Sequence, residues 1–123
     1  MPTDSEKLVT DFCNAWARLN IEELMGYFAD DAVYHNIPMD AARGKDAVRA
    51  TINTFLPMCK SIQFKVLRSA SSGNVVFNER IDVLDMGAKK VELPVTGVFE
   101  TRGNKISAWR DYFDMATYTK QLA

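Results

Sequence analysis

The second half of the chain is a series of β-rich segments with very short connections between them. These segments are residues 61–71, 75–85, 89–101 and 105–113. Each joint between them contains a glycine, namely Gly73, Gly87 or Gly103. Short glycine-containing joints between apolar β runs are typical of hairpins. The pattern therefore predicts an antiparallel meander, and any helices must pack around that sheet.

The first half of the chain carries helical patterns. Apolar residues recur at three- and four-residue steps over residues 5–19 and again over residues 45–56, which favours two amphipathic helices. Asn20 and Glu23 resemble a capping arrangement before a short second helix that continues through Leu24, Met25 and Phe28. A brief strand over residues 32–37 precedes Pro38, and a last helix is expected over residues 115–122.

This order of elements predicts an α+β fold rather than the alternating pattern of a parallel sheet. We expect a single domain over residues 1–123, in which a strongly curved, mixed or antiparallel sheet wraps around the N-terminal helices. Such a sheet forms a cone with a mouth at one end. The length and the hydrophobic fraction of 47% suit one ordinary globular domain.

Charge and composition narrow the range of partners. The chain has 15 basic and 16 acidic residues without long blocks of one sign, which argues against nucleic acid or an anionic membrane as a partner. The first residues are polar and acidic rather than basic and then apolar, and no apolar run approaches the roughly 20 residues of a membrane span. We therefore expect a cytoplasmic protein.

Several common kinds of site have no support in the sequence. His35 is the one histidine, which argues against a multi-histidine zinc site. Cys13 and Cys59 do not have the Cys-x-x-Cys spacing of metal-binding or redox-active cysteines. We expect both cysteines to be reduced and structural, and no metal site. Glycine-rich nucleotide loops and the serine-hydrolase elbow are missing too. Carboxylate chemistry remains.

Asn78, Arg80 and Asp82 share one face of a predicted strand. Two interpretations stay open, because this face could meet water or could line the interior of the cone. Asp111 favours the interior, since its neighbours on the same face are Trp109 and Phe113. A buried aspartate needs a partner, and arginine supplies paired N–H donors to carboxylates.

Tyr34 and Asn36 also share a strand face, where a hydroxyl and an amide could hold a water molecule. Ordinary polar contacts on an edge strand would explain the same pattern. His35 points to the opposite face and is expected to be structural.

Taken together, four segments resemble limonene-1,2-epoxide hydrolases in kind, order and spacing. They are Tyr34-His35-Asn36-Ile37-Pro38, Glu79-Arg80-Ile81-Asp82-Val83, Gly97-Val98-Phe99 and Trp109-Arg110-Asp111-Tyr112-Phe113-Asp114. The resemblance implies a cone-shaped fold of the nuclear-transport-factor-2-like (SnoaL-like) group, usually a homodimer. It also implies that water is added to a small epoxide to give a vicinal diol, without metal or cofactor.

The resemblance further implies roles for single residues. Asp111 would be the base that takes a proton from water, Asp82 the acid that protonates the epoxide oxygen, and Arg80 the bridge between them. Tyr34 and Asn36 would hold the water. The apolar wall around the substrate would comprise Phe55, Leu84, Leu93, Val95, Trp109 and Phe113.

Two other functions compete with this interpretation. A ketosteroid-isomerase-like or polyketide-cyclase-like enzyme would share the fold but would need a base and an oxyanion donor instead of an arginine between two acids. A non-enzymatic binding domain of the same fold would have no need for Tyr34, Asn36, Arg80, Asp82 and Asp111 together.

Overall fold

The computed structural model describes residues 2–123 and contains a six-stranded sheet in the order β2-β1-β6-β5-β4-β3. The strands are β1 (Phe28–Asn36), β2 (Ala42–Arg43), β3 (Ser61–Ser72), β4 (Val75–Asp85), β5 (Lys90–Arg102) and β6 (Lys105–Tyr112). Strands β3 to β6 pair consecutively and antiparallel, which confirms the predicted meander.

Strand β1 pairs with β6 in parallel, so the sheet is mixed. The strand is longer than expected, because the second helix ends at Met25 and Phe28 already pairs with Ile106. Phe28 was expected in that helix, but its side chain is buried in the core and its backbone belongs to the sheet. The two-residue strand β2 was not predicted, since two residues carry no periodicity.

The helices are α1 (Asp4–Ala15), α2 (Ile21–Met25), α3 (Lys45–Phe55) and α4 (Met115–Leu122). A turn of 3-10 helix, η1 (Trp16–Arg18), extends α1, and a second, η2 (Leu56–Met58), follows α3. Side chains cap the starts of the first two helices: Thr3 accepts a hydrogen bond from the Glu6 N–H, and Asn20 accepts one from the Glu23 N–H. The predicted cap at Asn20 is therefore confirmed. None of the helices in residues 2–123 combines the length and the apolar character that a membrane crossing requires.

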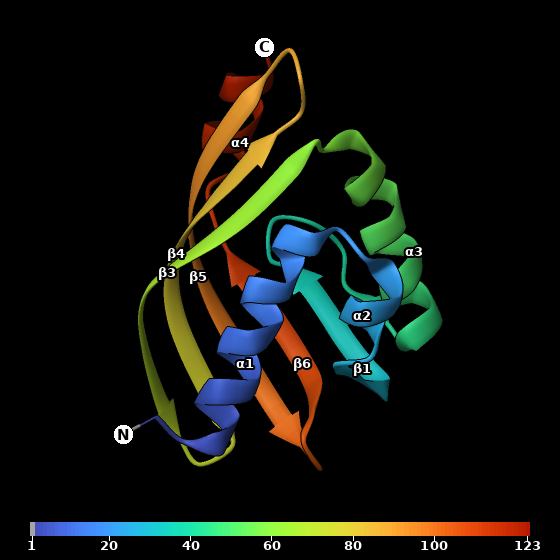
Figure 1. Ribbon diagram of the computed structural model, residues 1–123, viewed down its shortest axis with the longest axis vertical. Coiled ribbons are helices and arrows are strands. Elements are labelled where there is room, and N and C mark those ends of the chain that lie inside the picture. The colour runs from blue at the N-terminus through green and yellow to red at the C-terminus, as the bar shows by residue number, and fades with distance from the viewer. Residues whose placement is uncertain (1) are drawn as a thin grey trace.

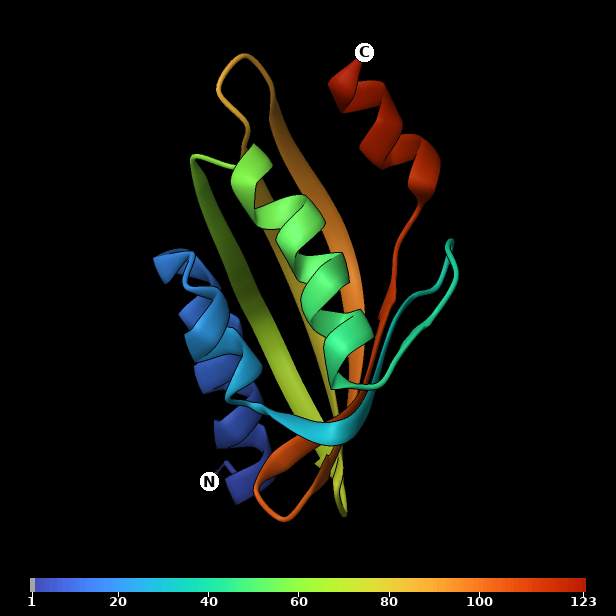
Figure 2. The same ribbon diagram turned by 90° about the vertical axis from the view of Figure 1, so that its right-hand side faces the viewer.

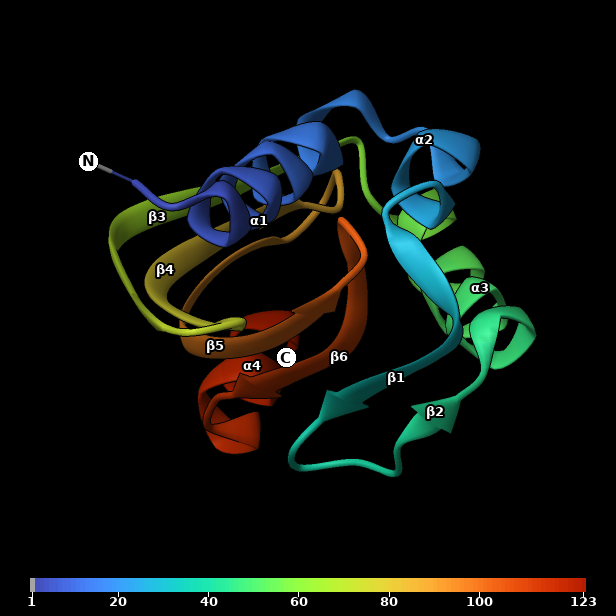
Figure 3. The same ribbon diagram turned by 90° about the horizontal axis from the view of Figure 1, so that it is seen from below.

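The sheet is strongly curved, and α1, α2 and α3 lie on its concave side (Figures 1 and 3). Helix α1 packs against β3 and β4, and α3 packs against β1 and β2. Helix α4 contacts β5 at the end of the molecule where the chain ends (Figure 2). There the side chain of Gln121 accepts a hydrogen bond from the Glu92 N–H and donates one to the Glu92 carbonyl. Those contacts fix α4 beside the part of β5 that β6 does not reach.

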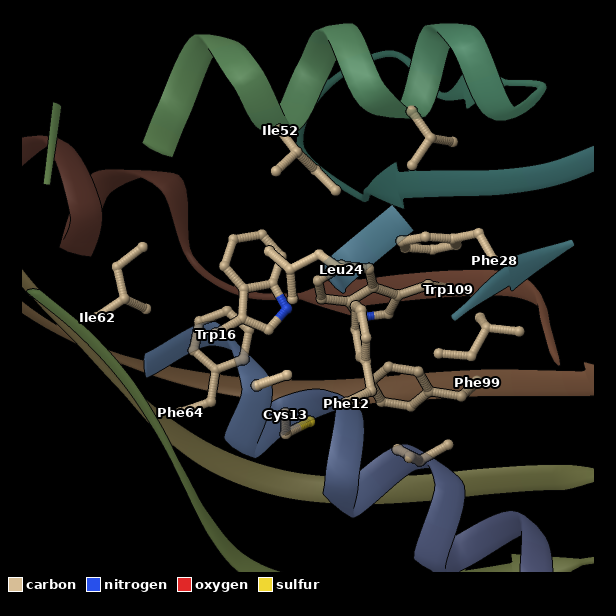
Figure 4. Packing of buried hydrophobic residues seen from close by; sticks show 14 of the residues in the cluster. Phe12, Cys13, Trp16, Leu24, Phe28, Ile52, Ile62, Phe64, Phe99 and Trp109 are labelled. Carbon is tan, nitrogen blue, oxygen red and sulfur yellow. The ribbon is translucent and has the colours of Figure 1, made fainter. Parts of the chain in front are cut away.

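Aromatic side chains fill the space between α1 and the sheet (Figure 4). Phe12 makes edge contacts with Phe28, Phe99 and Trp109, at ring-centroid distances of 5.3, 6.3 and 5.0 Å. Such pairs add to the free energy gained from burying the rings themselves. Both cysteines are free and buried, as expected.

Strand β4 has its polar face toward the concave side. Asn78, Arg80 and Asp82 are buried, whereas Phe77 on the opposite face is 42% exposed. Of the two interpretations left open by the sequence, the interior position is therefore correct. A strand with its charges inside and its apolar residues outside reverses the usual pattern, so these charges need a specific explanation.

Candidate active site

Arg80 lies at the centre of the buried polar group and binds both aspartates. Its Nε and Nη2 donate to the two oxygens of Asp82 at 3.0 and 2.9 Å. Its Nη1 and Nη2 donate to the two oxygens of Asp111 at 3.1 and 2.8 Å. The side chain of Arg80 is fully buried, and those of Asp82 and Asp111 are only 8% and 5% exposed. Each carboxylate is thus held in a bidentate contact away from bulk water.

Strand register brings these residues together. Asn78 on β4 pairs with Gly97 on β5, Gly97 pairs with Asp111 on β6, and Asp111 pairs with Asn36 on β1. Gly97 leaves the gap that the guanidinium fills, because a Cβ atom there would lie 2.5 Å from Arg80 Nη1. A side chain at that position is incompatible with the observed place of Arg80.

The two aspartates have different surroundings. Burial raises the pKa of Asp82 to about 6, against the opposing effect of Arg80. Asp111 accepts a third hydrogen bond, from Trp109 Nε1 to its Oδ1 at 2.6 Å. Burial disfavours the charge on Arg80, but the two carboxylates raise its pKa well above the usual value. The arrangement therefore favours a cationic arginine and lets Asp82 keep its proton to a higher pH than an exposed aspartate does.

Tyr34 and Asn36 lie beside this group on β1. The Tyr34 hydroxyl donates to Asn36 Oδ1 at 3.2 Å, and the tyrosine ring stacks on Trp109 with centroids 4.1 Å apart. Burial raises the pKa of Tyr34, so its hydroxyl keeps its proton. His35 is turned away from this group, and its Nε2 contacts the carbonyl oxygen of Met39 at 2.8 Å.

A cavity of about 410 Å³ opens onto these polar groups, and Tyr34, Asn36, Asp82 and Asp111 all line it. The rest of its wall is mostly apolar. Five of the six expected wall residues line it: Phe55, Leu84, Leu93, Val95 and Phe113. A largely apolar cavity with a few convergent polar groups is the usual form of a small-molecule site.

Trp109 is the one expected wall residue that does not line the cavity. It is fully buried and does not belong to the cavity wall, because Tyr34 stacks over its ring and Phe12, Phe28 and Phe99 surround it. Its place among the packed rings is visible in Figure 4. Its indole N–H instead donates a hydrogen bond to Oδ1 of Asp111.

The sequence interpretation missed several wall residues. They are Trp16, Met39, Thr51, Ile52, Thr54, Met58, Phe64, Met115 and Tyr118. Trp16 and Ile52 belong to apolar helical stripes, in which wall and core residues look alike. The methionines come from loops and helix ends far apart in the chain. A local sequence pattern does not show that such distant residues lie beside one cavity.

The raised pKa of Asp82 predicts a cost in folding stability. A carboxyl with a folded-state pKa above its unfolded value of 3.8 binds more protons when folded, so its contribution to stability is lost as pH rises from about 4 to 6. In Asp82→Asn this dependence is absent. We expect the free energy of unfolding of the variant, relative to wild type, to rise by about 2 kcal/mol over that range.

Urea unfolding of both proteins at a series of pH values measures this difference. Asp85→Asn is a suitable control, because Asp85 lies on the same strand but outside the cavity wall. A difference between Asp82→Asn and wild type that stays constant with pH contradicts the prediction.

Comparison with known proteins places the chain in a family. The family described as limonene-1,2-epoxide hydrolase catalytic domain matches residues 3–123. The chain belongs to this family. It is 32% identical over 114 residues to the epoxide hydrolase EphG of Mycobacterium tuberculosis strain H37Rv, and the match covers 93% of this chain and 76% of that protein.

Structural comparison agrees with membership of the limonene-1,2-epoxide hydrolase family. A solved structure of a limonene-epoxide-hydrolase-like epoxide hydrolase from M. tuberculosis superposes with a TM-score of 0.82 at 30% identity, covering 97% of this chain and 89% of that one. A putative polyketide cyclase from Xanthomonas campestris superposes with a TM-score of 0.87 at 15% identity, covering 98% and 97%. The second likeness shows the shared fold alone.

Proposed function

We propose that this protein is an epoxide hydrolase that adds water to a small lipophilic epoxide, cyclic or terpenoid, and releases a vicinal diol. Family membership supports the class of reaction. The observation that carries the proposal is the buried Arg80, which binds Asp82 and Asp111 at once beside an apolar cavity. Such a unit can present an acid and a base to the same substrate.

In the proposed reaction, Asp111 takes a proton from a water molecule as the water oxygen attacks an epoxide carbon. The carbon–oxygen bond of the ring breaks, and Asp82 donates its proton to the leaving oxygen. Tyr34 and Asn36 orient the water through the hydroxyl and the amide. Arg80 holds both carboxyl groups while the proton balance between them changes. After diol release, one proton must return to Asp82 and one must leave Asp111.

The choice of Asp82 as acid and Asp111 as base rests on their unequal surroundings. Asp111 accepts three N–H donors from Arg80 and Trp109, which stabilise its carboxylate form. Asp82 accepts two, and its pKa of about 6 leaves a protonated fraction near neutral pH. The two groups interact through one arginine, so the charge on one affects the other.

The cavity supports a compact, lipophilic substrate. Its volume of about 410 Å³ lies in the lower part of the range of small-molecule sites. Phe55, Leu84, Leu93, Val95 and Phe113 offer apolar surface to the carbon skeleton of the epoxide. Tyr34, Asn36, Asp82 and Asp111 line the same cavity, so the epoxide ring is expected to lie against these polar groups.

The simplest experiment incubates the purified protein with limonene oxide, cyclohexene oxide and related cyclic epoxides in buffer containing EDTA. We expect diol from at least one of them. Absence of diol across such a panel contradicts the proposed function. A ketosteroid isomerase or polyketide cyclase would instead act on carbonyl substrates, and assays with those substrates separate the alternatives.

A single turnover in ¹⁸O-labelled water tests the direct attack of water. We expect the label in the diol after one turnover with excess enzyme. Unlabelled diol in that first turnover would mean that a carboxylate oxygen attacked the epoxide and formed a covalent ester. The direct mechanism would then be wrong, although epoxide hydrolysis itself would stand.

We also propose that the protein forms a homodimer through the outer face of the sheet. Phe77 pairs with Val98 and Ile81 pairs with Pro94 on this face, where Phe77 is 42% and the nearby Tyr112 45% exposed. Exposed apolar residues of this kind are typical of interaction surfaces, and on this face Glu79 lies between Phe77 and Ile81. Light scattering should give twice the 13.9 kDa of one chain, and Phe77→Asp should reduce it to one chain. A single-chain mass for the wild-type protein contradicts this proposal.

A further inference from the structure

The guanidinium of Arg80 has one N–H that neither aspartate accepts. An arginine side chain offers five N–H donors, and Asp82 and Asp111 each accept two of them. The remaining donor, on Nη1, is directed to Oδ1 of Asn78 at 3.2 Å. Asn78 is only 2% exposed. All five donors of a fully buried cation are thereby satisfied.

Asn78 is itself held in one orientation. Its Nδ2 donates to Sγ of Cys13 on α1 at 3.6 Å, which leaves Oδ1 facing the arginine. Burial raises the pKa of Cys13 to about 12, so the sulfur stays a neutral thiol. The fixed amide also sits across from Gly97, where an added Cβ would lie 2.8 Å from Asn78 Oδ1. Helix α1 and strand β5 together keep the Asn78 amide against Arg80.

We propose that Asn78 is a positioning residue for the reaction, which supplies a neutral fifth acceptor to Arg80 and so fixes the plane in which Arg80 holds Asp82 and Asp111. This inference rests on the proposed epoxide hydrolysis. Without the acceptor, one N–H of a buried cation is left without a partner, and the guanidinium gains by turning away from the geometry that serves both aspartates. A charged acceptor would keep the guanidinium plane in place but would change how strongly Asp82 holds its proton.

The neutrality of Asn78 matters because few charges surround Asp82. The titratable and charged groups that face it are Arg80 on β4, Asp111 on β6, Cys13 on α1 and Tyr34 on β1. Cys13 and Tyr34 are uncharged, since burial raises the pKa of both. The group therefore contains one cation and two carboxyls, and a third carboxyl would make Asp82 hold its proton more strongly.

Two substitutions of similar size separate these effects. Asn78→Leu removes the acceptor, and we expect kcat to fall about tenfold or more with little change in KM. Asn78→Asp keeps an acceptor oxygen and adds a charge. We expect it to move the titration of Asp82, followed by the carbon-13 NMR signal of the aspartate carboxyls, to higher pH. As pH rises and Asp82 loses its proton, kcat/KM should fall. In Asn78→Asp this fall should also occur at higher pH.

Thr101→Val is the matched control. Thr101 is another buried polar residue, and its hydroxyl donates to the Asn74 carbonyl away from Arg80. We expect this variant to keep the wild-type kcat and the wild-type titration of Asp82. Thermal unfolding of each protein shows whether it folds. If Asn78→Leu does not fold, Asn78→Asp carries the test.

The proposal is overturned if folded Asn78→Leu retains kcat within about twofold of wild type, or if Asn78→Asp leaves the Asp82 titration unchanged. The NMR arm needs no substrate. A wild-type protein that makes no diol therefore contradicts the proposed function, whereas an unchanged titration contradicts the inference about Asn78.

Discussion

Asp111→Asn is expected to lower kcat by about 10²- to 10⁴-fold, which is the usual contribution of a well-placed general base. The substitution keeps the size of the side chain and an oxygen that can accept from Arg80 or Trp109. It removes the carboxylate that takes the proton from water. Initial rates of diol formation at saturating epoxide measure the effect, and thermal unfolding checks that the variant folds.

Asp85→Asn is the matched control for this substitution. Asp85 is an aspartate on β4 that accepts from the Gly87 N–H and lies outside the cavity wall. We expect its activity to remain near that of wild type. If folded Asp111→Asn keeps activity within tenfold of wild type, Asp111 is not the base and the assignment of roles must change.

Asp82→Asn is expected to cause a loss of similar size for a different reason. Asparagine cannot donate an acidic proton to the epoxide oxygen, so the oxygen must leave as an alkoxide. The loss should shrink for epoxides that carry an electron-withdrawing group on the carbon bearing the leaving oxygen, because their alkoxides need less help from an acid. The loss in Asp111→Asn should not shrink in the same way.

Comparing the two variants over such a series of epoxides separates acid from base. If the loss of activity shrinks equally for both variants across the series, the proposed roles of Asp82 as acid and Asp111 as base are wrong. If instead only the loss in Asp111→Asn shrinks across the series, Asp111 is the acid and Asp82 the base. Which residue is the acid and which is the base can thus be tested directly by kinetics.

The sequence predicts the architecture well because its strongest signals are local. The glycine joints at 73, 87 and 103 specify hairpins, and the apolar stripes specify the helices. The parallel pairing of β1 with β6 is a long-range contact and leaves no local pattern. Phe28 was misassigned because an aromatic residue after Leu24 and Met25 continues a helical stripe as readily as it begins a strand.

In the candidate site, too, local patterns are predictable and long-range contacts are not. Alternation along the strands places Arg80 and Asp82 on one face, and the aromatic neighbours of Asp111 indicate that its face is buried. The sequence cannot tell whether β4 presents that face inward, because this depends on which surface of the sheet the helices cover. Trp109 illustrates the limit, since an aromatic residue two positions from an aspartate predicts proximity but not which group contacts substrate.

The row of paired residues Asn78, Gly97, Asp111 and Asn36 across four strands has a consequence for assembly of the protein. A shift of one residue in any of these pairings would turn that strand's site residues to the opposite face. Molecules with such mispaired strands could remain compact, yet they could not turn over an epoxide. Activity recovered after refolding would therefore count the molecules in which all four strands have found their native partners.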